Sequence, residues 1–151
     1  MGKRTRTVWA VLLIFYLLGM VWLMFLNRPP LVLPGINLVP FRTVKEFSGL
    51  LHDGSPAPSY LRRVAAVNLL GNILMFLPLG FLPAMVFPRL RHWDRLLGTV
   101  AGVIIFAEAA QYFSRRGAAD IDDLILNLLG TAVGFCIFRI IEKAYKKRHP
   151  A

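Results

Sequence analysis

The sequence predicts an all-α integral membrane protein with four transmembrane helices and a short interfacial helix in the first outer loop. Hydrophobic residues make up 56% of the 151 residues, and a soluble domain of this size would not bury so much apolar surface. Four apolar stretches are each long enough to cross a hydrocarbon core of about 30 Å. Basic residues flank these stretches, as they do in membrane proteins. We therefore expect one membrane domain over residues 1–151.

The composition excludes several other classes of protein. The net charge of +10 occurs in some nucleic-acid-binding proteins, but no polar face here interleaves aromatic and basic residues, so no nucleic-acid partner is expected. A secreted disulfide scaffold is excluded because the single cysteine, Cys136, lies within an apolar run. The HExxH, Walker and dinucleotide motifs are absent, and no Ser or Cys nucleophile stands beside a His. Hydrolase and nucleotide chemistry of these types therefore have no support.

The four predicted spans are apolar runs that must be helical, because lipid offers backbone N–H and C=O groups no other partner. The first follows a basic leader but carries no small-residue cleavage site, which indicates an uncleaved signal anchor. The other three hold a few polar residues each. The predicted boundaries are residues 8–26, 64–87, 96–113 and 121–141.

Basic residues predict the orientation of the spans. They fill the leader before the first span, the short loop between the second and third spans, and the tail after the fourth. The positive-inside rule places such segments in the cytoplasm. We therefore expect a multi-pass protein of the bacterial cell (plasma) membrane with both termini cytoplasmic.

Residues 27–63 then form an outer loop. The loop begins with Pro- and Gly-rich chain, which favours turns. Phe41, Val44, Phe47 and Leu51 follow at helical spacing, with charged residues between them. This amphipathic pattern predicts a short helix on the outer membrane surface.

Polar residues inside the spans gather at one depth. Ionisable groups within a bilayer are costly, so each is by default a functional candidate. With both termini in the cytoplasm, the candidates all fall at the outer ends of their spans. This outer polar cluster comprises Asn68 and Asn72 in the second span, Glu108 and Gln111 in the third, and Asp120, Asp123 and Asn127 at the fourth.

The outer polar cluster can support several chemistries. The carboxylates of Glu108, Asp120 and Asp123 are oxygen ligands suited to a divalent cation. A carboxylate at membrane depth can also act as a general acid or base. Arginines beside the spans, Arg116 among them, can hold a phosphate or carboxylate through paired hydrogen bonds. Asp122 has a simpler interpretation, because the helix dipole favours an acidic residue in the first turn.

Two glycine motifs and a proline bear on helix packing. GxxxG motifs occupy residues 98–102 and 130–134, and such motifs let helices approach closely. These motifs either pack helices within one chain or form the contact faces of an oligomer. Pro78 is expected to bend the second span, either as a simple kink or so as to open a pocket under Asn72.

Several segments together carry a resemblance to a known family. They are NLVPF (37–41), NLLGNILMFLPLG (68–80), Glu108-x-x-Gln111, DIDDLILN (120–127), and then Gly130 and Gly134. On these segments the chain resembles the VanZ-like family of bacterial membrane proteins, named for a teicoplanin-resistance protein. One departure is Gly117, where the family often has an arginine, and the neighbouring Arg116 is the candidate substitute. The resemblance implies lowered susceptibility to lipoglycopeptides.

Functions of different classes remain open from the sequence. The leading hypothesis is a site that binds or handles a phosphorylated cell-envelope lipid at the outer leaflet, with membrane lipids, polyprenyl-phosphate-linked precursors or a lipoglycopeptide as partners. The first alternative is an intramembrane enzyme acting on such a lipid or glycopeptide, with Glu108 or Asp123 as acid or base. A transporter would need an oligomer, because four helices are few. If the cluster only packed helices, its hydrogen bonds would contribute about 0.6 kcal/mol each.

Overall fold

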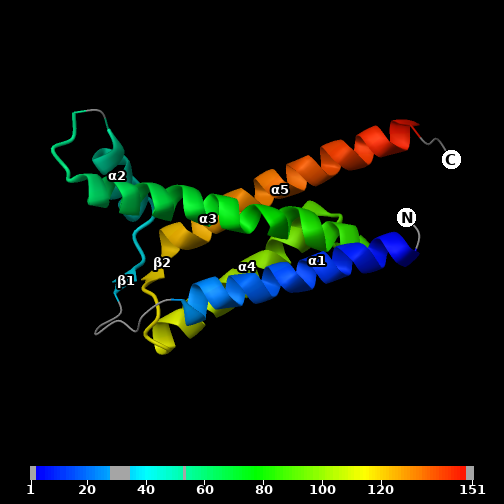
Figure 1. The fold of residues 1–151 in the computed structure, drawn as a ribbon, viewed down its shortest axis with the longest axis horizontal. Coiled ribbons are helices and arrows are strands. Elements are labelled where there is room, and N and C mark those ends of the chain that lie inside the picture. The colour runs from blue at the N-terminus through cyan, green and yellow to red at the C-terminus, as the bar shows by residue number, and fades with distance from the viewer. Residues whose placement is uncertain (1–2, 28–34, 53, 149–151) are drawn as a thin grey trace.

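The computed structural model describes residues 3–27, 35–52 and 54–148, which form a bundle of long helices with small loop structures at one end (Figure 1). The first long helix is α1 (Lys3–Val21), continued by a π-helical turn, η1 (Trp22–Leu26). The other long helices are α3 (Ser59–Val86), α4 (Trp93–Phe113) and α5 (Ile121–Arg148). The short elements are β1 (Ile36–Asn37), α2 (Arg42–Leu51), the 3-10 turn η2 (Pro88–Leu90) and β2 (Ala119–Asp120).

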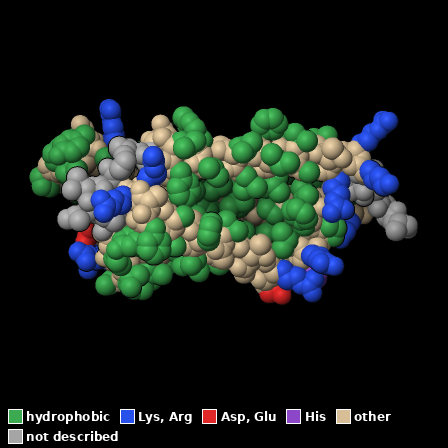
Figure 2. Space-filling model, turned by 90° about the horizontal axis from the view of Figure 1, so that it is seen from below, with side chains coloured by type: hydrophobic (Ala, Val, Ile, Leu, Met, Phe, Trp, Pro, Cys, Tyr) green, Lys and Arg blue, Asp and Glu red, His purple; other side chains and the backbone are tan. Residues whose placement is uncertain are grey.

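Within the described residues, four helices are long and apolar enough to cross a membrane, which confirms the predicted fold class. The 18-residue apolar stretch within each helix has a mean hydropathy that runs from 1.6 in α4 to 2.4 in α1 with η1. Outward side chains such as Phe15 and Phe106 are apolar and 69% and 76% exposed. Figure 2 shows this apolar surface between the two ends of the molecule. The chain is therefore a multi-pass membrane protein, and α2 confirms the short helix predicted in the first loop.

The helices extend beyond the predicted spans. α1 begins at Lys3 rather than at residue 8, α3 begins at Ser59 rather than at 64, and α5 continues to Arg148 rather than ending at 141. The physical reason is that hydropathy marks only the part of a helix suited to hydrocarbon. Backbone hydrogen bonds continue the same helices through basic and polar residues at both ends.

α3 and α5 pack with their backbones almost in contact. A Cβ atom placed on Gly134 would lie 1.9 Å from the carbonyl oxygen of Leu77, and one on Gly130 would lie 2.1 Å from that of Ile73. Gly80 of α3 is equally tight against the backbone of α5. Only glycine fits at these positions, so α3 of the same chain already fills the glycine face at residues 130–134.

The second glycine motif has a different environment. A Cβ atom on Gly98 or Gly102 of α4 would meet nothing within 4 Å. Of the two faces expected to support an oligomer, this one is therefore the face left open. α3 itself runs through Pro78 as one continuous helix.

The two ends of the bundle carry different structures (Figure 1). The start of α1 and the end of α5 lie together at one end, which we call the terminus end. β1, α2 and β2 lie at the other, which we call the loop end. There, β1 and β2 pair in parallel, with Ile36 opposite Ala119 and Asn37 opposite Asp120. Between the ends, the core is formed by Phe76, Leu96, Ile104, Phe135 and Phe138.

Candidate functional site

Asp120 fastens three segments at the loop end. Asp120 acts as the N-cap of α5, because its Oδ1 accepts a hydrogen bond from the backbone N–H of Asp122 at 2.9 Å. The same oxygen accepts a hydrogen bond from Nδ2 of Asn37 in β1 at 3.0 Å, and Oδ2 accepts one from the hydroxyl of Thr43 in α2 at 2.6 Å. The Asp120 carboxylate therefore ties the first loop to the start of α5.

Asp122 has no exposed surface and caps α2 from another helix. The backbone N–H of Phe41 donates to its Oδ1 at 2.5 Å, and that of Val44 donates to its Oδ2 at 3.1 Å. These are the two N–H groups that a capping box satisfies from within one helix. Phe41 has a left-handed φ of 62°, which a non-glycine residue keeps only where its surroundings hold it. Besides its expected interaction with the dipole of α5, Asp122 therefore caps α2, a role that the sequence does not reveal.

Gln111 and Arg116 hold η1 at the end of the first span. Gln111 is 2% exposed, and its Nε2 donates to the carbonyl oxygen of Met24 at 3.0 Å. Nη1 of Arg116 donates to the carbonyl oxygen of Phe25 at 2.5 Å. Arg116 is placed by the turn that ends α4, in which Arg115 has a φ of 57° and the Arg116 N–H bonds to the Gln111 carbonyl at 2.8 Å. π-helical turns such as η1 are rare and occur often at functional sites.

Asn72 and Asp123 connect α3 to α5. Nδ2 of Asn72 donates to Oδ1 of Asp123 at 2.5 Å. One turn before Asn72, Asn68 has a buried Oδ1 for which the described residues provide no hydrogen-bond donor. Asn127, one turn after Asp123, is 2% exposed, and its Oδ1 also lacks a donor within the described ranges. Glu108 lies half-buried on α4.

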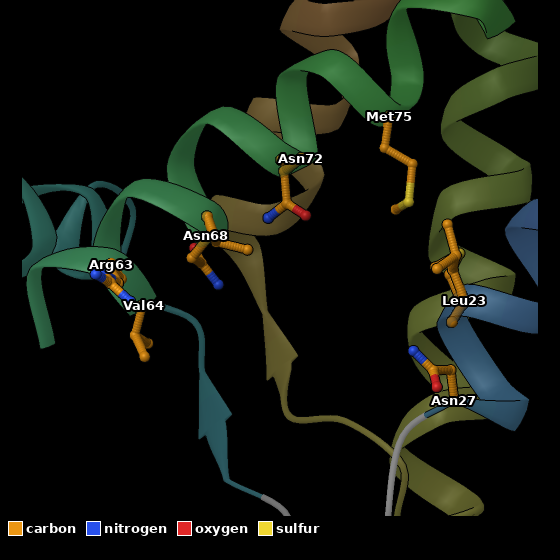
Figure 3. A pocket seen from close by; sticks show the side chains of 10 residues that line it. Leu23, Asn27, Arg63, Val64, Asn68, Asn72 and Met75 are labelled. Atoms are coloured by element: carbon orange, nitrogen blue, oxygen red, sulfur yellow. The ribbon is translucent and has the colours of Figure 1, made fainter. Parts of the chain in front are cut away.

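A groove of about 560 Å³ lies between η1 and the first half of α3 (Figure 3), and we call it the α1–α3 groove. Its polar lining comes from both walls and consists of Asn27, Arg63, Asn68 and Asn72. In Figure 3 the amides of Asn68 and Asn72 point into the space that separates α3 from α1, and Asn27 faces it from the other side. The apolar lining includes Leu23, Val64, Val67 and Met75. The groove therefore has the amphipathic lining that suits an amphipathic ligand.

The predicted site residues fall into separate groups around this groove. Asn68 and Asn72 line it, and Asp123 stands behind Asn72. Gln111 and Arg116 fix its η1 wall without being among its lining residues. Asp120, Glu108 and Asn127 are outside its lining.

The structure does not assemble the three-carboxylate cation site expected from Glu108, Asp120 and Asp123. Over the described ranges 3–27, 35–52 and 54–148, no three His, Cys, Asp or Glu side chains are grouped so that they can hold a metal ion. The physical reason at Asp120 is that both of its oxygens already accept hydrogen bonds from the loop and from α5.

Sequence reasoning missed several residues of this region. Asn37 and Thr43 bind Asp120, and Asn27 lines the α1–α3 groove. The only signal for Asn37 was its place at the start of the NLVPF segment. Arg63, by contrast, is one of the arginines beside the spans that can hold a phosphate, and it lines the groove.

Comparisons with curated proteins and with solved structures gave no match. The family model VanZ/LLP1 matches residues 11–142, a range that contains the α1–α3 groove, the loop-end contacts and most of the four long helices. Because the match covers most of the chain, the protein belongs to the VanZ/LLP1 family, which is associated at family level with teicoplanin resistance.

Proposed function

We propose that the protein binds a phosphorylated cell-envelope lipid, such as a polyprenyl-phosphate-linked precursor, in the α1–α3 groove. The observation that carries this proposal is the composition of the groove. Arg63 and three asparagines supply N–H donors, and apolar side chains line the remainder. Guanidinium and amide N–H groups suit phosphate oxygens, while the apolar lining suits a hydrocarbon chain. With the loop end outside, as the basic residues favour, the headgroup lies at the outer face of the cell membrane.

Asn68 adds support from hydrogen bonding. Its buried Oδ1 lacks a donor within the described part of the chain, and native proteins leave few such groups unsatisfied. A hydroxyl group of a lipid headgroup, or a water held by one, would supply the donor. The contacts from Gln111 to Met24 and from Arg116 to Phe25 hold the opposite wall in place. The groove is therefore preformed rather than assembled by the ligand.

Native mass spectrometry of the purified protein with a polyprenyl phosphate tests the proposal. Arg63→Gln is expected to lower the bound fraction at least about tenfold, because hydrogen bonds to charged groups contribute about 1.5–3 kcal/mol. Arg115→Gln is the matched control, since Arg115 is exposed at the same end and does not line the groove. Equal losses in both variants would indicate general charge attraction and would reject the groove as the site.

Enzymatic modification of the same lipid is the second candidate function. The 2.5 Å hydrogen bond between Asn72 and Asp123 favours it, because this contact holds a carboxylate directly behind the groove wall. Such a carboxylate can act as a general base when a small movement exposes it. A change in the mass of the bound lipid that disappears in Asp123→Asn would establish the enzyme. If the mass of the bound lipid stays unchanged over a long incubation, the enzyme is rejected and lipid binding remains as the proposed function.

A further inference from the structure

A second pocket, at the opposite end of the bundle, has no role in the lipid site proposed above. It has a volume of about 540 Å³ and lies at the terminus end between α1 and α5. Its apolar wall includes Trp9, Phe138 and Ile141. The ring of Phe81 packs edge-on between Trp9 and Phe138, with centroid distances of 5.5 and 6.1 Å. These ring contacts keep the wall in one arrangement.

The mouth of this pocket carries more positive than negative charge. The Glu142 side chain is 14% exposed and pairs with three cations: Arg139 Nη1 and Lys146 Nζ each lie 3.2 Å away, and Arg91 Nη1 lies 3.7 Å away. One carboxylate cannot neutralise three cations. Arg91 and Lys146 line the pocket itself, so the mouth retains a positive charge that an anion can balance.

Arg91 is held in position before any ligand arrives. Its Nε donates to the carbonyl oxygen of Ala84 at 3.1 Å, and its guanidinium carbon lies 5.8 Å from the centre of the Phe138 ring. A guanidinium has five N–H donors in a planar fork. The contacts made by Nε and Nη1 therefore leave donors that match the oxygens of a phosphate.

The surrounding surface strengthens the positive field. Lys and Arg side chains gather at the terminus end, on the right of Figure 2, beside the apolar surface of the bundle. Among the described residues of this end, the acidic ones are Asp94 and Glu142, whereas basic residues occur in α1, η2, the start of α4 and the end of α5. Basic pockets between helices at the level of the headgroups recognise anionic lipids.

We infer that the pocket between α1 and α5 binds an anionic phospholipid of the adjacent leaflet. Its phosphate lies at Arg91 and Lys146, and an acyl chain follows the wall formed by Trp9, Phe138 and Ile141. Charge complementarity favours an anionic headgroup over a zwitterionic one. A zwitterionic headgroup would bring a further positive charge to a pocket mouth that already has more positive than negative charge. The apolar wall selects a lipid over a free phosphate ion.

Lipid retention measured by native mass spectrometry tests this inference. The full chain is released from nanodiscs that contain equal amounts of phosphatidylglycerol and phosphatidylcholine. The wild type is expected to retain phosphatidylglycerol at least about tenfold over phosphatidylcholine, and the double variant R91Q/K146Q is expected to lose this preference. R89Q/K147Q is the matched control, because it removes the same charge from exposed residues outside the pocket lining.

Further variants keep the test decisive. If R91Q/K146Q fails to fold, K146Q alone, whose side chain is 70% exposed, is expected to lower the preference about threefold. Ile141→Trp narrows the apolar wall at constant charge and is expected to lower retention as well. Equal losses in R89Q/K147Q would overturn the inference, as would displacement of the lipid by millimolar inorganic phosphate. Because polyprenyl phosphate binding in the α1–α3 groove should persist in R91Q/K146Q, failure of one proposal is separable from failure of the other.

Discussion

The Asp122 carboxylate lies 2.5 Å from the backbone nitrogen of Phe41 and caps a helix to which it does not belong. The cap makes α2 dependent on α5 for its first turn. It also explains how an aspartate with no exposed surface is accommodated, because its charge meets two N–H donors and the positive end of a helix dipole.

Asp122→Ala is expected to destabilise the protein by about 2–4 kcal/mol, because it leaves two backbone N–H groups without an acceptor. Thermal unfolding followed by circular dichroism in detergent measures the change. Asp94→Ala is the control, since Asp94 is an exposed first-turn residue of α4 whose dipole contribution is at most about 1 kcal/mol. Equal melting temperatures for the two variants would contradict the cap.

Gly134→Ala is expected to separate α3 from α5, because the new Cβ would lie 1.9 Å from the Leu77 carbonyl oxygen. Overpacking of this kind costs about 1–3 kcal/mol or more. Gly102→Ala makes the same chemical change where nothing lies within 4 Å. It should leave the unfolding temperature unchanged or raise it slightly. A drop in both variants would mean that α4 also packs through its glycines, for example in an oligomer.

Gln111→Leu is expected to loosen η1, because it removes the donor to the Met24 carbonyl while keeping a side chain of similar size. Hydrogen–deuterium exchange should rise in the peptide that covers Trp22–Leu26 and remain unchanged in α3. Arg115→Gln, which alters the same turn without removing a contact to η1, is the comparison. Unaltered exchange at η1 would show that Arg116 alone holds this wall.

Asn68→Leu is expected to lower binding of a polyprenyl phosphate without lowering stability. Replacing a buried group that lacks a donor by an apolar one is neutral or favourable for folding. Native mass spectrometry and thermal unfolding on the same preparation give both values. A loss of stability together with binding would assign Asn68 a packing role instead.

Asp123→Ala is expected to abolish any teicoplanin phenotype in a bacterium that expresses the chain, while the protein stays in the membrane. The lost contact to Asn72 is a single hydrogen bond between membrane helices, and such bonds contribute about 0.6 kcal/mol on average. Susceptibility is compared with membrane abundance by immunoblot, with Asp94→Ala as the control. Full resistance at normal abundance would remove Asp123 from the site.

The helices were predictable from the sequence because each depends on local properties. Apolar runs of sufficient length identify the four spans, and the spacing of Phe41, Val44, Phe47 and Leu51 identifies α2. The ends of the spans were less predictable. Hydropathy changes where the solvent changes, whereas α5 remains helical to Arg148 because its backbone bonds do not depend on the lipid.

The contacts of the loop end were not predictable, because they join residues far apart in the chain. Asn37 and Asp120 are 83 positions apart, and Thr43 and Asp120 are 77 apart. Nothing local distinguishes Asp122, which caps another helix, from Asp123, which binds Asn72. The sequence also does not show which carboxylates lie near one another: within the described residues Glu108, Asp120 and Asp123 are not grouped as a metal site.

The cap on α2 also sets an order of events during synthesis. Phe41 precedes Asp122 by 81 residues, so at roughly 5–20 residues per second a ribosome needs roughly 4–16 s to supply the cap after α2 has emerged. Throughout that interval, β1 has no partner strand, and the N–H groups of Phe41 and Val44 have no acceptor from Asp122. The first loop therefore acquires these contacts only once the start of α5 has been synthesised.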